Sequence, residues 1–376
     1  MKKILITGGL GFIAQHLTQD LLDNDYEVVL YDNLSPQVHG PIPHINFKCL
    51  DHENVEFIRG DVRSYKDLLK AMNGVDCIIH LASETGTGQS MYEITKYNDV
   101  NTLGTANLLE ILTNEKHNIQ KLILSSSRAI YGEGSYHCDK CGTVSPSSRS
   151  STQLQAKKWT PTCPTCDANI TAIATKEDSN ILPASIYAAT KFAQEDLVRI
   201  TCTSLGIDAI TFRFQNVYGE GQSLQNPYTG ILSIFSTRIR RNMDLPIYED
   251  GAESRDFIHV SDIAKAVRLG VQSKLKGYNV YNVGSGHGIS VLDIAQKLVQ
   301  VFKGNITPHI SGEYRLGDIR HCYADLTRIK KDLEFSPQVS IDEGLERFAK
   351  WVLAEPLPED KLDLATKELK EKGLMS

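Results

Sequence analysis

Tyr187 and Lys191 are the residues whose types and spacing first point to chemistry. They stand four positions apart, which places them on one face of a helix. A free tyrosine has a pKa of about 10 and is a poor base at neutral pH, but a nearby ammonium favours the phenolate and lowers that pKa. Such a pair can exchange a proton with a substrate hydroxyl. The spacing alone could equally brace a helix, and Tyr92–Lys96 and Tyr136–Lys140 repeat it.

The amino-terminal stretch has the pattern of a dinucleotide site. The apolar run Lys3–Thr7 predicts a buried strand, which the glycine-rich turn Gly8–Ala14 and an amphipathic helix follow. A second predicted strand ends at Asp32. Glycines let the backbone approach a pyrophosphate, and the helix N-terminus supplies amide donors. An acid at Asp32 would accept the ribose hydroxyls and repel a 2′-phosphate, which favours NAD over NADP.

Strands and helices continue to alternate as far as Ser127. Further strands are predicted at residues 55–59, 75–82 and 121–124, with helices at 65–72 and 98–112. This alternation is typical of an α/β fold with a doubly wound parallel Rossmann sheet. In such sheets ligands bind at the carboxyl ends of the strands. The residues at those ends are Asp32, Asp61, Ala82 and Ser127.

Composition limits the class of protein. The chain has 376 residues, 41% of them hydrophobic, which is enough for one large domain or two joined lobes. A net charge of −6 predicts no nucleic-acid partner. No apolar run reaches the roughly 18 residues of a membrane span, and the run after Met1 is too short for a signal peptide. We therefore expect no membrane partner and a cytoplasmic location, with the eight cysteines as thiols or metal ligands.

Short motifs in a consistent order resemble those of the extended short-chain dehydrogenase/reductases, a family that includes nucleotide-sugar epimerases and dehydratases. They are Thr7–Ile13, Asp32–Leu34, Gly60–Val62, His80–Ala82, Asn101–Thr105, Ser125–Gly132, Tyr187–Lys191, Arg213–Gly219, Ser254–Val260 and Tyr281–Gly284. The resemblance implies that a smaller mixed α/β substrate lobe follows the Rossmann sheet.

The resemblance also implies a catalytic trio, an NAD cofactor and a nucleotide-diphosphate sugar as substrate. Tyr187 would be the acid/base, Ser127 would orient a sugar hydroxyl, and Lys191 would hold the nicotinamide ribose and lower the pKa of Tyr187. The implied cofactor contacts are Gly8, Gly11, Phe12, Ile13, Asp32, Asn33, Asp61, Val62, Leu81, Ala82, Asn101, Ser125, Tyr187, Lys191 and Phe214.

The two residues after Ser127 bear on the reaction. Dehydratases of the family carry an Asp-Glu pair there to eliminate water, whereas this chain has Arg128 and Ala129. Oxidation at C4 with return of the hydride to the opposite face needs only the trio and a bound nicotinamide, so a nucleotide-sugar 4-epimerase is favoured. The alternatives are a nucleotide-sugar 4-reductase or dehydrogenase, a UDP-sugar 4-epimerase and a non-catalytic NAD-sensing protein.

Arginines are expected to hold the substrate diphosphate. Arg255 and Arg315 match positions where relatives grip it, and arginine binds phosphate through two nitrogens at once. Arg320 could act in the same way, while Arg128 or Tyr228 could reach the sugar. The implied substrate contacts are Gln89, Ser90, Ser127, Asn216, Arg255 and Arg315.

Two Cys-x-x-Cys pairs lie within a stretch of about residues 134–180. Their members are Cys138, Cys141, Cys163 and Cys166. Four thiolates at this spacing can surround a zinc ion as in a zinc ribbon, and with no open position the zinc would be structural. Redox pairs or disulfides are the alternative. A ribbon can also bind nucleic acid, but the insertion has few basic residues, among them Arg149, Lys157 and Lys158.

This stretch is an insertion relative to the family. Ser127 and Tyr187 are 60 positions apart, much farther than in relatives. Together with Ser127–Gly134, Asn226–Gly230 and Gly317–Cys322, the insertion resembles a subgroup described as dTDP-L-rhamnose 4-epimerases.

The expected organisation has three parts. Residues 1–216 form the NAD-binding Rossmann domain with the insertion, residues 217–355 form an interleaved substrate lobe, and residues 356–376 form a charged tail, either a solvated helix or a frayed end. The helices at 98–112 and after Tyr187 match those that form a dimeric four-helix bundle in relatives, so we expect a homodimer.

Overall fold

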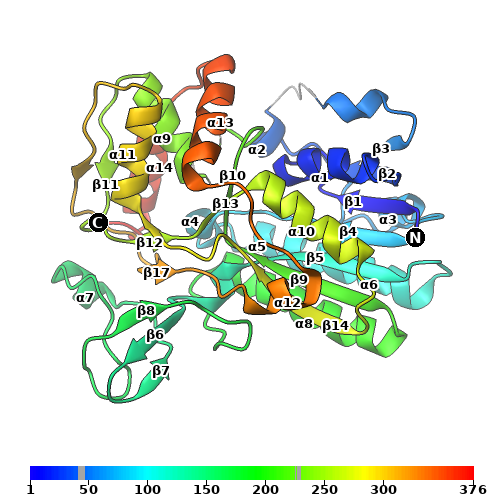
Figure 1. Cartoon of the computed structure of the whole chain (residues 1–376), viewed down its shortest axis with the longest axis horizontal. Coiled ribbons are helices and arrows are strands. Elements are labelled where there is room, and N and C mark those ends of the chain that lie inside the picture. Colours follow the sequence, from blue (N-terminus) through cyan, green and yellow to red (C-terminus); the bar gives the residue numbers. More distant parts are fainter. Residues whose placement is uncertain (41–46, 225, 227–229) are drawn as a thin grey trace.

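The computed structural model describes residues 1–40, 47–224, 226 and 230–376. Its centre is a parallel sheet of seven strands (Figure 1). In order across the sheet these are β14 (Tyr278–Val283), β9 (Asp208–Phe214), β5 (Lys121–Ser127), β4 (Cys77–His80), β1 (Lys3–Thr7), β2 (Glu27–Asp32) and β3 (Val55–Arg59). The strand order reverses between β1 and β4, and ligands bind at such switch points. The predicted doubly wound α/β fold is confirmed.

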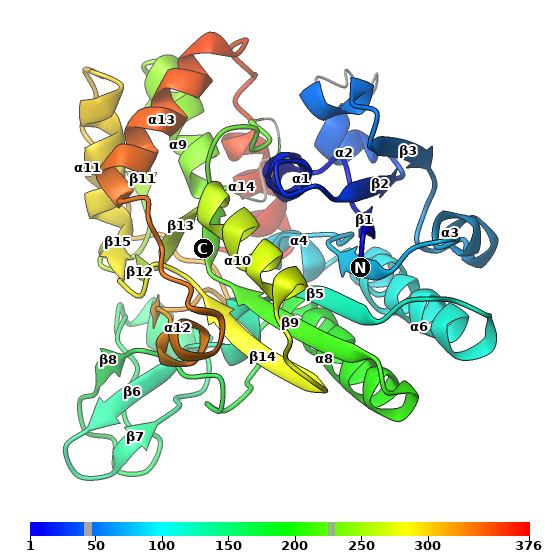
Figure 2. The same ribbon diagram turned by 45° about the vertical axis from the view of Figure 1, so that its right-hand side comes forward.

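Helices cover both faces of this sheet (Figure 2). One layer contains α1 (Phe12–Leu22), α10 (Val260–Gln272) and α12 (Thr327–Leu333), and the other contains α3 (Tyr65–Ala71), α6 (Gly104–Asn114) and α8 (Ile186–Leu205). Ile4 and Ile6 pack in the first layer, whereas Leu5 packs in the second. Because both faces are buried, the strands have continuous apolar sequences rather than alternating ones.

A second lobe packs around its own apolar cluster. Its helices are α9 (Ile231–Arg240), α11 (Val291–Val301), α13 (Ile341–Ala354) and α14 (Leu362–Glu371). Its strands form the pairs β10 (Asn216–Tyr218) with β13 (Phe257–His259) and β11 (Pro246–Ile247) with β16 (His309–Ile310), and the triplet β15 (Ile289–Ser290), β12 (Ser254–Arg255) and β17 (His321–Cys322). The chain passes between the lobes more than once. The elements α10, β14 and α12 alternate in the sequence with elements of the second lobe, but they belong to the large sheet and its helical layers.

The insertion forms a small antiparallel sheet that projects at the lower left of Figure 1. It consists of β7 (Gly142–Val144), β6 (Ser135–Cys138) and β8 (Thr171–Ile173), with the short helix α7 (Ser151–Gln155). The remaining elements are α2 (Pro36–His39), α4 (Thr87–Ser90), α5 (Ile94–Tyr97), the 3-10 turns Lys48–Asp51 and Arg128–Tyr131, and a π-helical segment, Asn98–Leu103, between α5 and α6.

The carboxyl-terminal helix α14 is packed rather than solvated, which corrects the expectation for the tail. Leu362 and Leu369 are only 6% and 3% exposed. Arg238 binds the carboxylates of Asp360 and Asp363 at 2.9 and 2.8 Å, which ties the helix to α9. The sequence did not indicate this packing, because most side chains of the tail are polar or charged and the apolar face of α14 is narrow. In the part of the chain that the structure describes, no helix is long and apolar enough to cross a membrane.

Candidate active site

The glycine turn after β1 is shaped for close approach of a ligand. Gly8 has φ of +68°, and a Cβ there would lie 2.9 Å from the backbone nitrogen of Ala82. Gly11 is the N-cap of α1 and leaves the first amides of that helix free of a capping side chain. Bulkier residues would fill the space that a pyrophosphate needs. The turn therefore fits a dinucleotide.

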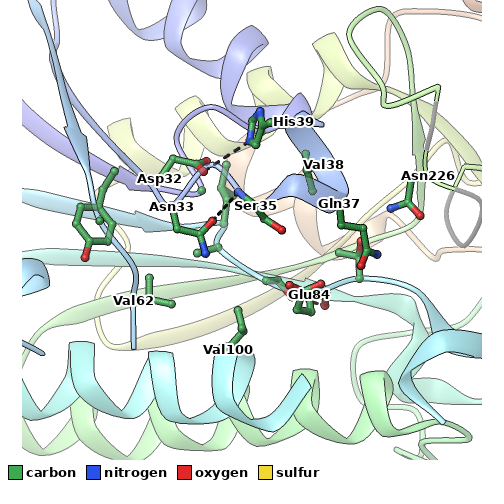
Figure 3. A pocket seen from close by; sticks show the side chains of 18 residues that line it. Asp32, Asn33, Ser35, Gln37, Val38, His39, Val62, Glu84, Val100 and Asn226 are labelled. Carbon is green, nitrogen blue, oxygen red and sulfur yellow. Dashed lines mark hydrogen bonds and ion pairs between the residues drawn. The ribbon is translucent and has the colours of Figure 1, made fainter. Parts of the chain in front are cut away.

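Asp32 lies at the carboxyl end of β2, in a cavity of about 130 Å³ (Figure 3). Its carboxylate accepts hydrogen bonds from the backbone N–H groups of Leu10 and Leu34 at 3.0 and 2.8 Å. These bonds fix the carboxylate on the cavity wall beside Asn33. A carboxylate held there can accept ribose hydroxyls.

Most residues assigned to the cofactor lie on this cavity or on an adjoining cavity of about 450 Å³. They are Gly8, Gly11, Phe12, Ile13, Asp32, Asn33, Val62, Leu81, Ala82, Ser125, Tyr187, Lys191 and Phe214. Asp61 and Asn101 do not line either cavity. Asp61 accepts a hydrogen bond from Asn33, and Asn101, in the π-helical segment, binds the Ser83 hydroxyl at 3.0 Å. Both therefore support residues of the cavity wall.

The larger cavity brings Ser127, Tyr187 and Lys191 together. Ser127 ends β5, while Tyr187 and Lys191 lie one turn apart in α8. The hydroxyl of Ser185 accepts a hydrogen bond from the Ala188 N–H at 3.2 Å and starts that helix. A strand end and a helix start thus present all three side chains to one space.

Burial and charge set the protonation of this trio. Burial raises the pKa of Tyr187, and a hydrogen bond with Ser127 and the charge of Arg128 oppose that rise. Burial lowers the pKa of Lys191 to about 7, while the Glu195 carboxylate opposes it. Lys191 Nζ also lies 3.5 Å from the Ser83 hydroxyl. The lysine can therefore change its charge close to neutral pH.

The other two Tyr–Lys pairs lie away from the described cavity walls. The Lys372 ammonium sits over the Tyr92 ring at 4.6 Å, and Lys96 pairs with Glu93 at 3.1 Å. Tyr136 is fully buried in the small sheet of the insertion, where Lys140 is exposed. Location therefore separates Tyr187 and Lys191 from the pairs with the same spacing.

A third cavity, of about 170 Å³, is lined by three arginines and adjoins the catalytic one at Asn216. The arginines are Arg128, Arg255 and Arg315. The Arg315 guanidinium lies 4.7 Å from the centre of the Tyr248 ring. Glu253 lines the same space, and burial raises its pKa to about 7. Asp318 also lines this space, so three guanidinium groups outnumber two carboxyl groups there, and the net positive charge suits an anion.

Other residues assigned to the substrate lie elsewhere. Gln89 and Ser90 are buried in α4 and do not line the described cavities; Gln89 exchanges hydrogen bonds with Gln37 at 2.8 and 3.2 Å. The loop before them, at residues 85–87, lines the catalytic cavity instead. Arg320 binds Asp250 at 2.6 Å and is not on the arginine-lined cavity. Tyr228 lies outside the described residues.

The four cysteines of the insertion gather at one end of its sheet. Their sulfur atoms all lie within 4.8 Å of one another, and Cys138 Sγ is 3.6 Å from Cys166 Sγ. A tetrahedral zinc with Zn–S bonds of about 2.3 Å would hold sulfurs about 3.8 Å apart. Backbone N–H groups of Thr165 and Cys166 lower the pKa of Cys163 to about 6, whereas hydrogen bonding with the Cys166 thiol raises the pKa of Cys141 to about 12. The donor set therefore fits a metal of this kind.

Comparison with known proteins agrees with this geometry. Residues 4–157 and 163–284 match the NAD dependent epimerase/dehydratase family. The chain belongs to this family. A dTDP-L-rhamnose 4-epimerase of Burkholderia thailandensis is 35% identical over 357 residues, which cover 94% of this chain and 96% of that protein. The predicted family membership is confirmed.

Solved structures of other epimerases align along nearly the same length. A UDP-N-acetylglucosamine 4-epimerase from Methanobrevibacter ruminantium, in complex with UDP-N-acetylmuramic acid, has a TM-score of 0.74 and 30% identity, covering 94% of this chain and 98% of that one. A UDP-glucuronic acid 4-epimerase from Bacillus cereus, in complex with UDP-glucuronic acid and NAD, has a TM-score of 0.77 and 26% identity, covering 94% and 99%.

Sequence reasoning missed a buried charge network in this epimerase/dehydratase family member. Arg149 of the insertion binds Glu133 at 3.1 Å and Glu249 at 2.6 Å, and also the carbonyls of Trp159 and Asp318. In the sequence, Arg149 is one of the few basic residues of the insertion, and nothing in the pattern around it indicates that it is buried. The only sequence feature that pointed to this network was the acidic residue Glu133, directly after Gly132, which ends the turn that follows Ser127. The residues that Arg149 binds lie too far from it in the sequence to be inferred.

His80 provides a pH prediction. It is buried between the hydroxyls of Thr7 and Thr105, at 2.7 and 2.9 Å, and burial lowers its pKa to about 3. The unfolded chain binds a proton at this histidine below about pH 6.5, whereas the folded chain does not until the pH approaches 3. The contribution of neutral His80 to the free energy of unfolding is therefore complete above about pH 6.5 and is lost as the pH falls toward 3. The free energy of unfolding should fall there by up to about 1.4 kcal/mol per pH unit. Denaturant titrations of wild type and His80→Gln measure this, and equal slopes would contradict it.

Proposed function

We propose that this protein is an NAD-dependent nucleotide-sugar 4-epimerase and that it acts on a dTDP-6-deoxyhexose such as dTDP-L-rhamnose. The observation that carries the proposal is the convergence of Ser127, Tyr187 and Lys191 on one cavity that adjoins both the glycine turn and the arginine-lined cavity. The 35% identity to a dTDP-L-rhamnose 4-epimerase over almost the whole chain supports the choice of sugar. Because the solved relatives named above were determined with UDP-sugars bound, a UDP-sugar 4-epimerase is the second candidate function.

Each residue of the trio has a defined task in this reaction. Bound NAD supplies the hydride acceptor and donor. The Tyr187 phenolate takes the proton of the C4 hydroxyl and later returns it, while Ser127 orients that hydroxyl. The Lys191 ammonium holds the nicotinamide ribose and favours the phenolate. Arg128 and Ala129 stand where a dehydratase would need its acid and base, so the keto sugar is reduced again rather than dehydrated.

A panel of sugar nucleotides tests the proposal. Pure protein would be incubated with dTDP-, UDP- and GDP-sugars, and NMR would detect a C4 epimer. An epimerase gives the C4 epimer with no net NADH. Stoichiometric formation or consumption of NADH would instead identify a dehydrogenase or reductase. No product from any sugar would refute the enzymatic proposals.

Leu362 of α14 is expected to contribute to substrate affinity, because it lines the arginine-lined cavity where the nucleotide would lie. Leu362→Ala should weaken binding of dTDP or UDP about threefold to tenfold, since it removes a buried apolar contact. Leu364, 69% exposed on the same helix, gives the matched control. Calorimetry on both alanine variants measures the difference, and equal affinities would contradict the prediction.

Structural zinc at the four cysteines is a separate part of the proposal. The clustering of their sulfur atoms supports it, and the separation of 3.6 Å between two sulfurs exceeds the length of a disulfide bond, about 2 Å. Such zinc would stabilise the insertion. Metal analysis of protein purified without chelator should find about one zinc per chain, and Cys141→Ser should reduce it. Zinc-free protein with an unchanged melting temperature would refute this part.

Homodimerisation and a cytoplasmic location complete the proposal. Leu103 and Ile200, in the helical segments expected at the dimer interface, are 47% and 55% exposed, which supports a partner surface. A reducing cytoplasm would keep the four cysteines as ligands. Light scattering would test the mass, and a Leu103→Glu variant should be monomeric.

A further inference from the structure

Arg128 occupies the junction between the catalytic cavity and the arginine-lined cavity. It directly follows Ser127 and opens the short 3-10 turn, whose Ala129 N–H donates to the Ser127 hydroxyl at 3.2 Å. Ser127 lines the catalytic cavity, whereas Arg128 lines the other, and the two spaces meet at Asn216. Of the three arginines of that cavity, Arg128 is the one adjacent in sequence to the catalytic trio.

Arg128 differs from the buried arginines that serve structure. Arg149, Arg213 and Arg320 each bind carboxylates at 2.6–2.7 Å. Across the described residues, Arg128 has no ion pair or hydrogen bond; burial and then the charge of Arg255 lower its pKa, and the side chains of Cys322 and Asp318 oppose that fall. Among the described bonds, Arg255 donates to the backbone carbonyls of Ser254 and Arg320, so neither of these two guanidinium groups on the cavity wall is bonded to a carboxylate, and the pair suits an anion.

Arg128 also acts on Tyr187. Its charge and the Ser127 hydrogen bond are the two influences that oppose the rise in the pKa of Tyr187. Lys191 has a pKa of about 7, so its charge is incomplete at neutral pH. A guanidinium stays charged at every pH at which the protein is folded. Arg128 therefore adds a charge that does not change with pH to the charge of the Lys191 ammonium, which lies one turn from Tyr187 in α8.

We propose that Arg128 binds the phosphate next to the sugar of a nucleoside-diphosphate substrate and, from the same position, favours the phenolate form of Tyr187. The assignment of the phosphate rests on the proposed function: a sugar with its C4 hydroxyl at Tyr187 would extend toward the arginine-lined cavity, where Arg128 is the arginine adjacent in sequence to Ser127. Arg255, on the same cavity but without a direct influence on Tyr187, would bind the substrate only.

The experiment uses NAD-loaded protein and two readouts that need no turnover. The first is the pKa of Tyr187, from the tyrosinate absorbance of each variant minus that of its Tyr187→Phe partner. Arg128→Met should raise this pKa by about one unit or more, Arg128→Lys should largely restore it, and Arg255→Met should leave it near the wild-type value. If Arg128→Lys restores the pKa of Tyr187, the effect of Arg128→Met comes from the lost charge and not from damage to the fold.

The second readout is calorimetric binding of dTDP and dTMP. Arg128→Met should weaken dTDP binding about tenfold or more, since a charged hydrogen bond is lost, and should leave dTMP binding almost unchanged. An unchanged pKa of Tyr187 in Arg128→Met, or equal losses for dTDP and dTMP, would overturn the proposal. Failure to find a C4 epimer would contradict the proposed function and leave both of these results standing, so the two failures are distinguishable.

Discussion

Tyr187→Phe is expected to lower kcat by about two to four orders of magnitude, because that is the usual contribution of a positioned acid/base. The substitution removes one hydroxyl and keeps the ring, so the cavity shared with Ser127 and Lys191 should persist. Binding of NAD and of dTDP should change little. Steady-state kinetics with NMR detection of the C4 epimer, together with calorimetry, separates the loss of turnover from a loss of binding.

Tyr92→Phe provides the matched control for this variant. Tyr92 has the same spacing to a lysine, but its ring contacts Lys372 and lies away from the described cavity walls. Its substitution should leave kcat within a factor of about two of wild type. Comparable losses in both variants, or undiminished turnover in Tyr187→Phe, would remove Tyr187 from the reaction.

The features that sequence predicted well are local or follow from sheet geometry. β1, Gly8, α1 and Asp32 are consecutive in the chain, so one pattern describes the whole unit. Ser127 could be placed beside this unit because all strand ends of a parallel sheet face the same edge. The pairing of Thr7 with His80 in the sheet register shows this alignment.

The features that sequence failed to predict depend on contacts between distant segments. Gln89 and Ser90 lie in a one-turn helix whose orientation is set by packing, including the approach of Leu369 to Gly88. Nothing near residue 89 in the sequence records a contact with residue 369. The burial of α14 was missed for the same reason, since Arg238 and its acidic partners are more than 120 positions apart.

Arg149→Met is expected to lower the free energy of unfolding by about 3–5 kcal/mol, because it removes the ion-pair partner of the buried Glu133 carboxylate and leaves Glu249 with Arg320 alone, at 3.1 Å. The side chains of Arg149, Glu133 and Glu249 are 1%, 0% and 2% exposed. Burial already raises the pKa of Glu133, and the Arg149 charge opposes that rise. Without Arg149 the Glu133 carboxyl should bind a proton more readily. Denaturant titration of the zinc-replete protein measures the loss.

Arg199→Met supplies the control, since Arg199 pairs with Asp196 on the surface and is 51% exposed. Surface pairs of this kind contribute about 0–1 kcal/mol to the free energy of unfolding.

The pH dependence of the stability loss in Arg149→Met gives a second check. A folded-state pKa above the unfolded value makes stability fall as pH rises, so the deficit of Arg149→Met should shrink from pH 8 toward pH 5.

Adding Glu133→Gln should recover part of the lost stability at neutral pH, since it removes a charge that has become uncompensated. This double variant distinguishes charge from packing, because a purely steric defect at Arg149 would not respond to it. Glu133 also accepts the Arg320 N–H at 2.6 Å, and Arg149 holds the Asp318 carbonyl at 2.9 Å. The same network therefore fixes the segment that carries Arg315. We expect Arg149→Met to weaken dTDP binding as well, whereas Arg199→Met should not.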